Sequence, residues 1–495
     1  MILRNVIEGL PVISLRGSVD VEIKGICSDS RHFQPGDLFI AVRGHQFDGH
    51  LFIGEACEKK ASAVVVEDDR VVSVRFAGAV IKVNNSRSAV DVLAANFYAK
   101  PSENLFVAGV TGTNGKTTIT HMIEAILIAN KMPTGVIGTI NNHLGKSVVA
   151  SSHTTPDALE LQKLLAQWIT AGAKAVSIEV SSHALSLMRA DSVHFDTAVF
   201  TNLTRDHLDF HKTMNDYIKA KARLFKELLK KSKKKNKRAI INIDDPHWES
   251  MMPDVPTWKY GLDKGDIKAE NINLSFDGTI FKAITPNGSV DIHLQMIGRH
   301  NISNALGAIG VGLHAGVLIQ TIAEALSKLE GVKGRLEKVA SKSGIHVFVD
   351  YAHTDDALKN VLSFLKNLRD EKSPNARIIT LFGCGGDRDS GKRPLMMKAA
   401  QSFSDLVVVT SDNPRTEDAN EIIEDILGGA SAQSLVTGEN VIVEPDRRHA
   451  IELAIRKAKP GDVVLIAGKG HEDYQIIGTK KHPFDDVQVA REYLR

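Results

Sequence analysis

Short apolar runs alternate with amphipathic segments along most of the chain, a pattern that is typical of α/β folds. In the clearest case, the apolar run Leu105–Thr111 leads through a glycine-rich turn into apolar positions at helical spacing from Ile119 to Leu127. This order predicts a strand, a glycine loop and a helix. Further apolar runs at similar intervals predict a mostly parallel sheet around them.

The chain has 495 residues, which is too long for a single core, and its apolar runs fall into three regions. The predicted fold class is α/β with three domains, which cover residues 1–102, 103–334 and 335–495. The central domain is expected to be doubly wound around the glycine loop, and the C-terminal domain to be Rossmann-like. Lys100–Glu103 is expected to be a linker, because Pro101 ends the preceding helix. Strands are predicted at residues 36–42, 63–66, 79–83, 175–180, 197–200, 239–243, 345–350, 378–382, 406–410 and 463–467.

The composition is that of an ordinary globular protein, with 43% hydrophobic and 24% charged residues. The sequence has no apolar run long enough to span a membrane, and Met1–Val6 does not resemble a signal peptide. Cys27, Cys57 and Cys384 are far apart in the sequence, so we expect neither a disulfide nor a zinc site. These features predict a cytoplasmic protein without a membrane span.

One segment is strongly basic, because Lys230–Arg238 contains seven basic residues and no acidic one. Such a run could bind nucleic acid or another anionic surface. The segment lacks the interleaved aromatic residues of a nucleic-acid groove. We therefore favour a solvated helix end before the next strand, and we expect no nucleic-acid partner.

The glycine loop Gly112–Thr118 carries the clearest chemical signal. Backbone N–H groups at the start of a helix can bind phosphates, Lys116 would reach the β- and γ-phosphates, and the Thr117 hydroxyl would bind Mg²⁺. The match is incomplete, because Val110 stands where the usual spacing has a glycine. The alternative is a glycine turn that only connects a strand to a helix.

Charged residues near the ends of apolar runs are candidates for a metal site. Glu179 lies at the end of the run 175–180, where burial is costly unless a metal or a salt bridge compensates its charge. His207, Asp209 and His211 could form a transition-metal cluster. Because a phosphate-bound Mg²⁺ is already implied, we favour a site for that hard cation that uses only one of the three.

Lys221 lies on the apolar side of a predicted helix, together with Tyr217 and Phe225. Lys219 and Arg223 lie on the opposite face. The ordinary explanation is a lysine that extends its ammonium group to water. A protonated lysine does not bind a metal, but carbamylation by CO₂ would turn it into a carboxylate-like ligand, which is the second possibility.

Two arginines follow strand ends in the C-terminal region. Arg388 and Arg415 each come after a glycine or proline turn, and Glu472 follows another predicted strand. Arginine binds a carboxylate through two parallel hydrogen bonds. The three side chains could therefore form a site for a zwitterion with more than one carboxylate. Separate surface ion pairs are the alternative.

Together, these motifs resemble the Mur ligase family over essentially the whole chain and in the family's order. The matching segments are Gly112–Thr118, Thr154–Pro156, Glu179–His183, Thr201–Asp209, Tyr217–Lys221, His300–Asn304, Gly383–Asp389 and Gly468–Gln475. Within the family, they are similar to the ligases that add the third residue of the peptidoglycan peptide.

The resemblance implies an ATP-dependent amide ligase of peptidoglycan precursor synthesis. Such an enzyme phosphorylates the D-glutamate side-chain carboxylate of UDP-N-acetylmuramoyl-L-alanyl-D-glutamate, and the amine of an amino acid then attacks the acyl phosphate. The implied cofactors are ATP and Mg²⁺, with a CO₂-derived carbamate on Lys221. We expect only these small-molecule partners and a monomeric chain.

The resemblance also implies roles for individual residues. The expected catalytic residues are Lys116, Glu179, His207 and Lys221. One Mg²⁺ would be held by Thr117 and Glu179, and a second by His207 and carbamylated Lys221. The residues expected to contact the nucleotide are Gly112, Thr113, Asn114, Gly115, Lys116, Thr117, Thr118, Asn304, Arg335, Asp350 and His353.

Three further groups of residues are implied for the other substrates. The UDP part would be bound by Ser28, Ser30, His45, Gln46 and Phe47. The muramoyl-peptide part would be bound by His153, Thr154, Thr155, Ser181, Leu187 and Arg189. The incoming amino acid would be bound by Arg388, Asp412, Asn413, Pro414, Arg415, Gly468 and Glu472. His153 and Leu187 differ from the asparagine and glutamine that are usual in the family.

The Asp412–Arg415 motif resembles that of enzymes that use meso-diaminopimelate, whose second carboxylate a forked arginine can bind. We expect this amino acid rather than L-lysine, because lysine would leave Arg415 without its partner. A glutamyl ligase of the folylpolyglutamate synthetase type is one alternative. A nucleotide-operated switch that binds a partner is another, although it would not need Lys221 or the two arginines.

Overall fold

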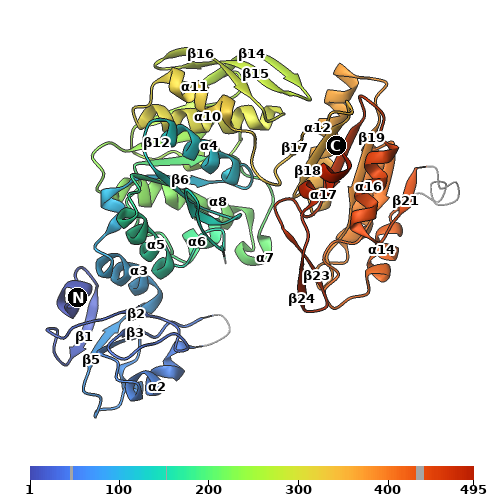
Figure 1. The fold of residues 1–495 in the computed structure, drawn as a ribbon. Coiled ribbons are helices and arrows are strands. Elements are labelled where there is room, and N and C mark those ends of the chain that lie inside the picture. The colour runs from blue at the N-terminus through green and yellow to red at the C-terminus, as the bar shows by residue number, and fades with distance from the viewer. Residues whose placement is uncertain (45–47, 152, 431–439, 495) are drawn as a thin grey trace. The chain divides into compact units, whose positions relative to one another are not determined.

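Parallel strands covered by helices make up most of the structure (Figure 1). The structure, a computed structural model, describes residues 1–44, 48–151, 153–430 and 440–494. Contacts divide the chain into two units. Unit 1 contains Met1–Glu270, Ala283–Val290 and Ser303–Leu326, and unit 2 contains Asn271–Lys282, Asp291–Ile302 and Ser327–Arg495.

The first sheet of unit 1 has five strands in the order β1-β5-β4-β3-β2. They are β1 (Val12–Arg16), β2 (Ile26–Cys27), β3 (Leu38–Ile40), β4 (Ala63–Val66) and β5 (Ala79–Val83). The accompanying helices are α1 (Leu3–Val6), η1 (Gly49–Phe52), α2 (Ile53–Glu58), η2 (Asp69–Val71) and α3 (Ser86–Phe97). Strands β3 and β4 are buried throughout, which is why they read as unbroken apolar runs.

The second sheet of unit 1 carries the glycine loop and has the order β13-β12-β11-β6-β10-β7-β8-β9. Its strands are β6 (Phe106–Thr111), β7 (Thr134–Ile137), β8 (Asn142–Leu144), β9 (Ser147–Val149), β10 (Ala175–Glu179), β11 (Thr197–Phe200), β12 (Arg238–Asn242) and β13 (Thr257–Tyr260). The strands from β13 to β7 are parallel, and β8 and β9 are antiparallel at the edge. Strand β6 therefore has a parallel neighbour on each side.

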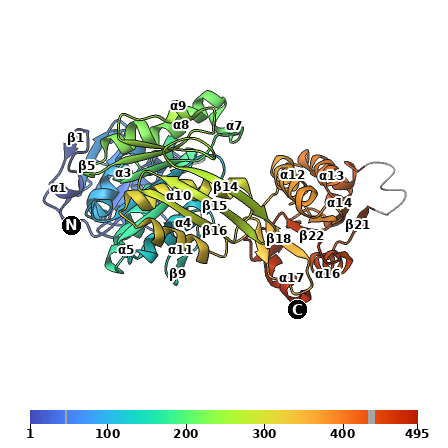
Figure 2. The same cartoon turned by 90° about the horizontal axis from the view of Figure 1, so that it is seen from above.

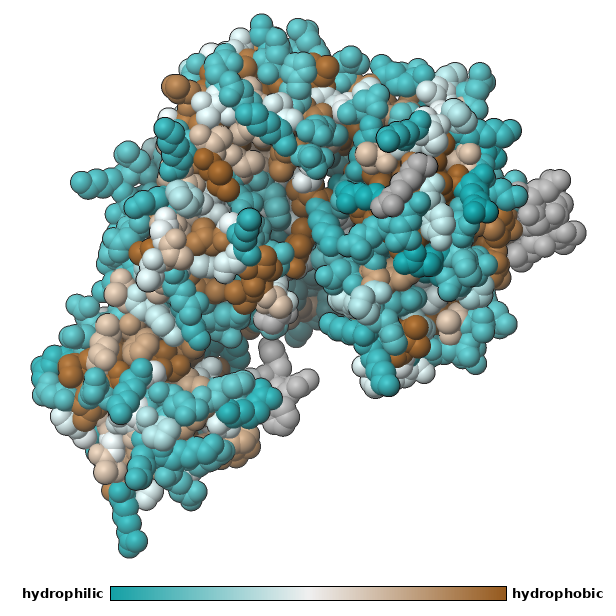
Figure 3. All heavy atoms as spheres, in the orientation of Figure 1, coloured by the Kyte–Doolittle hydropathy of each residue, from teal (hydrophilic) through white to brown (hydrophobic). Residues whose placement is uncertain are grey.

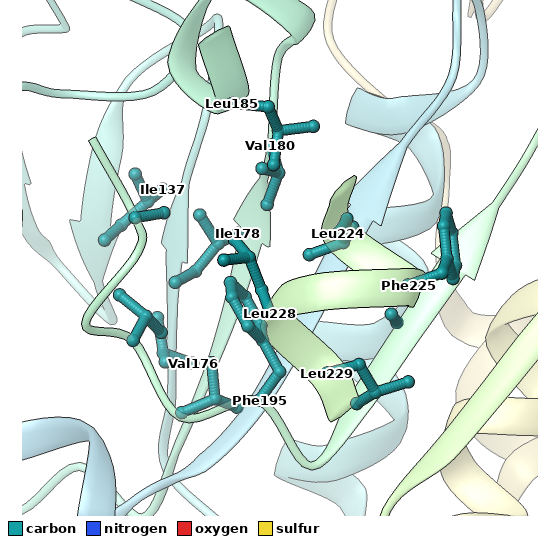
Figure 4. Packing of buried hydrophobic residues seen from close by; sticks show 14 of the residues in the cluster. Ile137, Val176, Ile178, Val180, Leu185, Phe195, Leu224, Phe225, Leu228 and Leu229 are labelled. Carbon is teal, nitrogen blue, oxygen red and sulfur yellow. The ribbon is translucent and has the colours of Figure 1, made fainter. Parts of the chain in front are cut away.

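The helices around this sheet are η3 (Pro101–Asn104), α4 (Lys116–Ala129), α5 (Ala158–Thr170), α6 (Ser182–Ser186), α7 (Leu208–His211), α8 (Met214–Arg223), η4 (Leu224–Leu229) and α9 (Trp248–Met251). Helix η4 is a π-helix that continues α8 without a break. Its leucines pack in an apolar core with Phe195 and with residues of β10 such as Ile178 (Figure 4). This core anchors η4, and through it α8, against the sheet.

The segment predicted as a linker is packed instead. Pro101–Asn104 forms the 3₁₀ helix η3, in which Pro101 and Ser102 are buried. The Ser102 hydroxyl accepts a hydrogen bond of 3.0 Å from the backbone N–H of His194. The segment connects α3 to β6 as a packed short helix, because a proline that ends one helix can also start the next.

The basic segment Lys230–Arg238 lies between η4 and β12, as expected for a helix end before a strand. Several of its lysines pair with acidic residues of unit 1. Lys233 lies 3.2 Å from Glu103, and Lys234 lies 3.2 Å from Asp196. The basic charge is thus partly compensated within the fold.

A three-stranded sheet and two helices follow in the sequence. They are β14 (Lys268–Ser275), β15 (Gly278–Thr285), β16 (Gly288–Leu294), α10 (Arg299–His314) and α11 (Ile319–Lys328). Inward and outward side chains alternate in β15 and β16. This alternation explains why they do not appear as apolar runs and were not predicted.

The main sheet of unit 2 has the order β17-β18-β22-β19-β20-β21. Its strands are β17 (Glu337–Val339), β18 (His346–Asp350), β19 (Ile378–Phe382), β20 (Leu406–Val409), β21 (Val441–Val443) and β22 (Val463–Ala467). All are parallel except β17. A separate hairpin consists of β23 (Tyr474–Ile477) and β24 (Lys480–Pro483).

Helices cover both faces of this sheet (Figure 2). One face packs against α12 (Asp355–Lys372), α13 (Lys392–Phe403) and α14 (Ala419–Leu427). The other packs against α16 (Arg447–Lys457) and α17 (Asp486–Tyr493). The predicted α/β class and every predicted strand are therefore present, with small differences at the strand ends.

The surface is mixed in character. Hydrophilic side chains cover much of the face drawn in Figure 3, with smaller hydrophobic areas between them. In the described part of the chain, no helix is both long and apolar enough to cross a membrane.

Candidate functional site

The glycine loop starts where β6 ends. Val110 is buried within β6, opposite Glu179 of β10 and Val199 of β11. The strand continues to Thr111, so the loop begins at Gly112. This explains why position 110 holds a β-branched strand residue rather than the glycine that the usual spacing has there.

Gly112 and Gly115 have backbone conformations and surroundings that require glycine. Their φ angles are +152° and +86°. A Cβ at Gly112 would overlap the hydroxyl of Thr201, and one at Gly115 would overlap the amide oxygen of Asn304. Helix α4 begins directly afterwards, at Lys116. A glycine-lined loop that leads into a helix N-terminus is a geometry that binds phosphates.

Two lysines meet at this loop. The carbonyl oxygen of Gly112 accepts a hydrogen bond of 3.0 Å from Lys116 Nζ and one of 2.8 Å from Lys221 Nζ. Lys116 also donates to the Thr113 carbonyl at 2.7 Å. The side chains of Lys116 and Lys221 thus both lie against the glycine loop.

Lys221 is buried, with 1% of its surface exposed, so the alternative of a lysine that extends its ammonium group to water does not apply. Tyr217 and Phe225 are buried on the same face, as predicted, and Lys219 is exposed. Burial, followed by the nearby charge of Lys116, lowers the pKa of Lys221 well below its ordinary value. The side chain is therefore biased towards the neutral amine.

Tyr217 was predicted only as an apolar neighbour, but its hydroxyl is also part of the site. It shares a hydrogen bond of 3.0 Å with the hydroxyl of Thr113, and its ring centre lies 4.6 Å from Lys221 Nζ. Helix α8 consequently contacts the glycine loop twice, one helical turn apart. The sequence could have indicated this contact, because Tyr217 lies on the apolar face of the helix and a buried tyrosine hydroxyl needs a hydrogen-bond partner.

Glu179 ends β10 and is fully buried. Its carboxylate accepts hydrogen bonds from the N–H of Thr139 at 2.9 Å and from the Thr139 hydroxyl at 3.0 Å. Thr139 was not predicted, because β7, which precedes it, was not recognised as a strand. These two bonds fix the carboxylate beside the end of β6.

His207 lies at the start of α7 with φ at +52°, a strained conformation for a residue with a side chain. Its Nε2 lies 3.4 Å from Asp206, and its ring centre 4.8 Å from that of His183. Burial lowers the pKa of His207, against the opposing effect of Asp206. Within the described residues, no group of three or more His, Cys, Asp or Glu is arranged to hold a metal. The transition-metal cluster of His207, Asp209 and His211 is thus not present.

The residues predicted for the muramoyl-peptide lie beside Glu179. Thr155 donates from its hydroxyl to the Glu179 carbonyl at 2.7 Å and accepts from the N–H of Ser181 at 3.0 Å. Arg189 donates to the Thr155 carbonyl at 3.0 Å. Thr154 and Thr139 share a hydrogen bond of 3.1 Å. These residues form one connected network.

The remaining predicted residues of unit 1 lie nearer the surface or in the first sheet. His153 is exposed, and Leu187 is half-buried at the end of α6. Ser28 and Ser30 follow β2 in the first sheet. The predicted contacts of His45, Gln46 and Phe47 lie outside the described residues.

In unit 2, four neighbouring parallel strands end in polar clusters at the same edge of the sheet. After β18, Asp350 accepts from the N–H groups of Leu336 at 2.7 Å and of Ala352 at 2.8 Å. Burial raises its pKa, opposed by Arg335. Arg335 and His353 flank the Tyr351 ring, at 5.4 Å and 4.5 Å. The three residues predicted to contact the nucleotide here therefore surround one turn.

Arg388 and Arg415 lie beside the same glycine turn. A Cβ at Gly385 would lie 2.9 Å from Arg415 Nη1 and 3.8 Å from Arg388 Cγ. Arg415 also donates to the Gly386 carbonyl at 2.6 Å, and its φ is +54°. Both arginines thus lie beside this turn, and the exposed guanidinium of Arg388 donates to the Asp387 carbonyl at 3.2 Å.

The other predicted amino-acid contacts adjoin this turn. Asp412, Asn413 and Pro414 are buried, and Asn413 donates to Glu472 at 2.9 Å. A Cβ at Gly468 would lie 3.7 Å from Asp412 Oδ2. Lys469, a residue that was not predicted, lies between them with its side chain fully buried. In the sequence, Lys469 could have been found as a charged residue that follows the apolar strand β22 after a single glycine.

Three family models match successive parts of this chain. Residues 22–98 match "Mur ligase family, catalytic domain", residues 110–312 match "Mur ligase middle domain", and residues 334–470 match "Mur ligase, glutamate ligase domain". A UDP-N-acetylmuramoyl-L-alanyl-D-glutamate–2,6-diaminopimelate ligase from Geobacter metallireducens is 46% identical over 494 residues. The alignment covers 97% of this chain and 95% of that relative.

Solved structures of related proteins are similar to this chain as well. A structure of a UDP-N-acetylmuramoyl-L-alanyl-D-glutamate–2,6-diaminopimelate ligase has a TM-score of 0.71 at 33% identity and covers 95% of this chain and 94% of its own. The Mycobacterium tuberculosis folylpolyglutamate synthase complexed with ADP and AMPPCP has a TM-score of 0.60 at 16% identity. It covers 77% of this chain and 92% of its own, and it shows a shared fold only.

We expect Gly112→Ala to lower the free energy of unfolding by about 2 to 4 kcal/mol, because strain at this φ adds to the overlap with Thr201. Gly145→Ala is the matched control, since Gly145 also has a positive φ but has no atom within 4 Å of the added Cβ. That control should cost only about 1 kcal/mol. Urea denaturation of both variants measures the difference, and equal losses would contradict the prediction.

Proposed function

The chain belongs to the Mur ligase family, and on that premise we propose that it adds meso-diaminopimelate to UDP-N-acetylmuramoyl-L-alanyl-D-glutamate at the expense of ATP. The observation that carries the proposal is the 46% identity to a ligase of that name over 97% of the chain. The chain has the three domains of the family, and it is an amide-bond-forming ligase. We propose boundaries at residues 1–102, 103–334 and 335–495.

The nucleotide phosphates are proposed to bind at Gly112–Thr118, with Asn304 beside the loop. Lys116, which contacts loop carbonyls in the structure, would place its ammonium group on the phosphates. Phosphoryl transfer depends mainly on positioning and on charge stabilisation. The product of the transfer is an acyl phosphate on the D-glutamate side chain. The amine of the amino acid attacks it, and phosphate leaves.

Thr117 and Glu179 are proposed to hold Mg²⁺. Their near-complete burial supports this, as does the way Thr139 orients the Glu179 carboxylate. Mg²⁺ is commonly bound by one or two protein groups together with substrate phosphates, so a full protein cage is not required. When bound, the ion neutralises charge on the phosphates.

His207 and a carbamylated Lys221 are proposed as ligands of a second Mg²⁺. The buried position of Lys221 supports the carbamate, because only a neutral amine reacts with CO₂. The Gly112 carbonyl, 2.8 Å away, can still accept the one N–H that a carbamate nitrogen retains. The modified side chain would thus keep its present contact while it gains a carboxylate-like end.

With ¹³C-labelled bicarbonate, we expect the wild-type protein to show a carbamate ¹³C resonance that Lys221→Met lacks. Lys219→Met is the control, since Lys219 is exposed on the other face of α8. NMR of the three proteins at the same pH makes the measurement. A carbamate signal that survives in Lys221→Met would rule out this site.

The cytoplasm is the proposed location, where the UDP-linked substrate and ATP are available. The product would enter peptidoglycan synthesis, and through it cell shape and division. We propose that the chain acts as a monomer.

The function is tested by phosphate release from ATP in the presence of UDP-N-acetylmuramoyl-L-alanyl-D-glutamate. We expect release that depends on meso-diaminopimelate and is much weaker with L-lysine. Release with folate and glutamate alone would instead indicate a folylpolyglutamate synthetase activity. ATP turnover without any dependence on an amino acid would indicate a nucleotide-operated switch.

The amino acid is proposed to bind at Arg388, Asp412–Arg415, Gly468 and Glu472, with its distal carboxylate on Arg415. We expect Arg415→Ala to lower kcat/KM for meso-diaminopimelate by about tenfold to a hundredfold, because a charged hydrogen-bond pair is lost. The KM for ATP should change little. Arg456→Ala is the control, since Arg456 pairs with Glu452 on α16. Steady-state kinetics in which Arg415→Ala matches this control would exclude the assignment.

A further inference from the structure

Lys469 is a buried cation at the centre of the proposed amino-acid site. Its side chain has no exposed surface, and its Nζ lies 3.2 Å from Asp412 Oδ1, 3.0 Å from Asn413 Oδ1 and 3.3 Å from Glu472 Oε2. An ammonium group has three N–H donors, and these three oxygens match them. Such burial is tolerated only where charge and hydrogen bonds compensate it.

The three acceptors come from two different strand ends. Asp412 and Asn413 follow β20, whereas Glu472 follows β22. Further bonds connect them, since Asn413 Nδ2 donates to Glu472 Oε2 at 2.9 Å and the N–H of Ile476 donates to Asn413 Oδ1 at 2.9 Å. Lys469 is the one side chain of this network that contacts all three acceptors.

A second buried pair holds the strand ends themselves. Arg447 and Asp486 are both fully buried and form a salt bridge of 2.7 Å. Arg447 also donates to the carbonyl of Ala467 at 2.9 Å and to that of Ser411 at 3.4 Å. These contacts fix the backbone of β22 and the turn after β20 without Lys469. Lys469 therefore acts on the side chains beyond the strand ends.

We propose that Lys469 is a positioning residue that sets the specificity of this ligase for its amino-acid substrate. The inference rests on the proposed function. Lys469 occupies one oxygen each of Asp412 and Glu472, so that their second oxygens are held for the ammonium group of a zwitterionic amino acid. Its charge also offsets part of the repulsion between the two carboxylates. Without it, the acceptors would separate or turn towards other partners.

The test compares Lys469→Met, which removes every donor at similar volume, with Lys366→Met. Lys366 is a control because it forms only an exposed pair with Asp370 on α12. We expect Lys469→Met to raise the KM for meso-diaminopimelate about tenfold or more, since several charge-assisted hydrogen bonds are lost. The KM for ATP should stay close to that of the wild type. A variant with a merely structural defect would have a raised KM for both meso-diaminopimelate and ATP.

Lys469→Arg provides a second variant if Lys469→Met does not fold. It keeps the charge but changes the positions of the N–H groups, so we expect a KM for meso-diaminopimelate between those of the wild type and Lys469→Met, again with little change for ATP. The proposal is overturned if folded variants keep the wild-type KM for the amino acid, or raise both KM values by the same factor. The assay of the wild type distinguishes a failure of this proposal from a failure of the proposed function. A wild type that is inactive with meso-diaminopimelate would refute the function itself.

Discussion

Two lysines from different helices donate to one backbone oxygen, that of Gly112, and the function proposed for unit 1 depends on this contact. Two ammonium groups at one carbonyl repel each other, and Lys221 is the one that is fully surrounded by protein. Burial, and after it the nearby charge of Lys116, lowers the pKa of Lys221, which favours a neutral amine beside the glycine loop. The apolar core around η4, which continues α8, packs against the same sheet.

Parallel strands impose the second constraint. All carboxyl ends of a parallel sheet meet at one edge, so residues that follow different strands gather there whatever their separation in sequence. In unit 1 this places Glu179 and Thr201 beside the glycine loop. In unit 2 it brings Arg388, Asp412 and Glu472 to neighbouring strand ends. In each unit, the parallel strand order thus brings charged side chains together at one edge of the sheet.

Most strands buried on both faces could be predicted from the sequence, because they read as unbroken apolar runs. Strand β7 is an exception, since it is buried throughout but its four residues begin with a threonine and a glycine and form no apolar run. Edge strands could not be predicted. Strand β9 is exposed throughout, and β16 alternates between buried and exposed residues. Because β7 was not predicted, Thr139, which follows it and orients Glu179, was not recognised as a site residue either. The packing of the linker segment was not predicted either, since the hydrogen bond of Ser102 to His194 is not visible in local composition.

The sequence by itself determined the order of strand, glycine loop and helix, and it placed Lys221 on a buried face. Both follow from local periodicity. Only the tertiary structure decided what Lys221 contacts, because Gly112 lies 109 residues away along the chain. It also excluded a metal cluster at His207 within the described residues and revealed the partners of Lys469. Such pairings depend on how strands are ordered in a sheet, which apolar spacing does not encode.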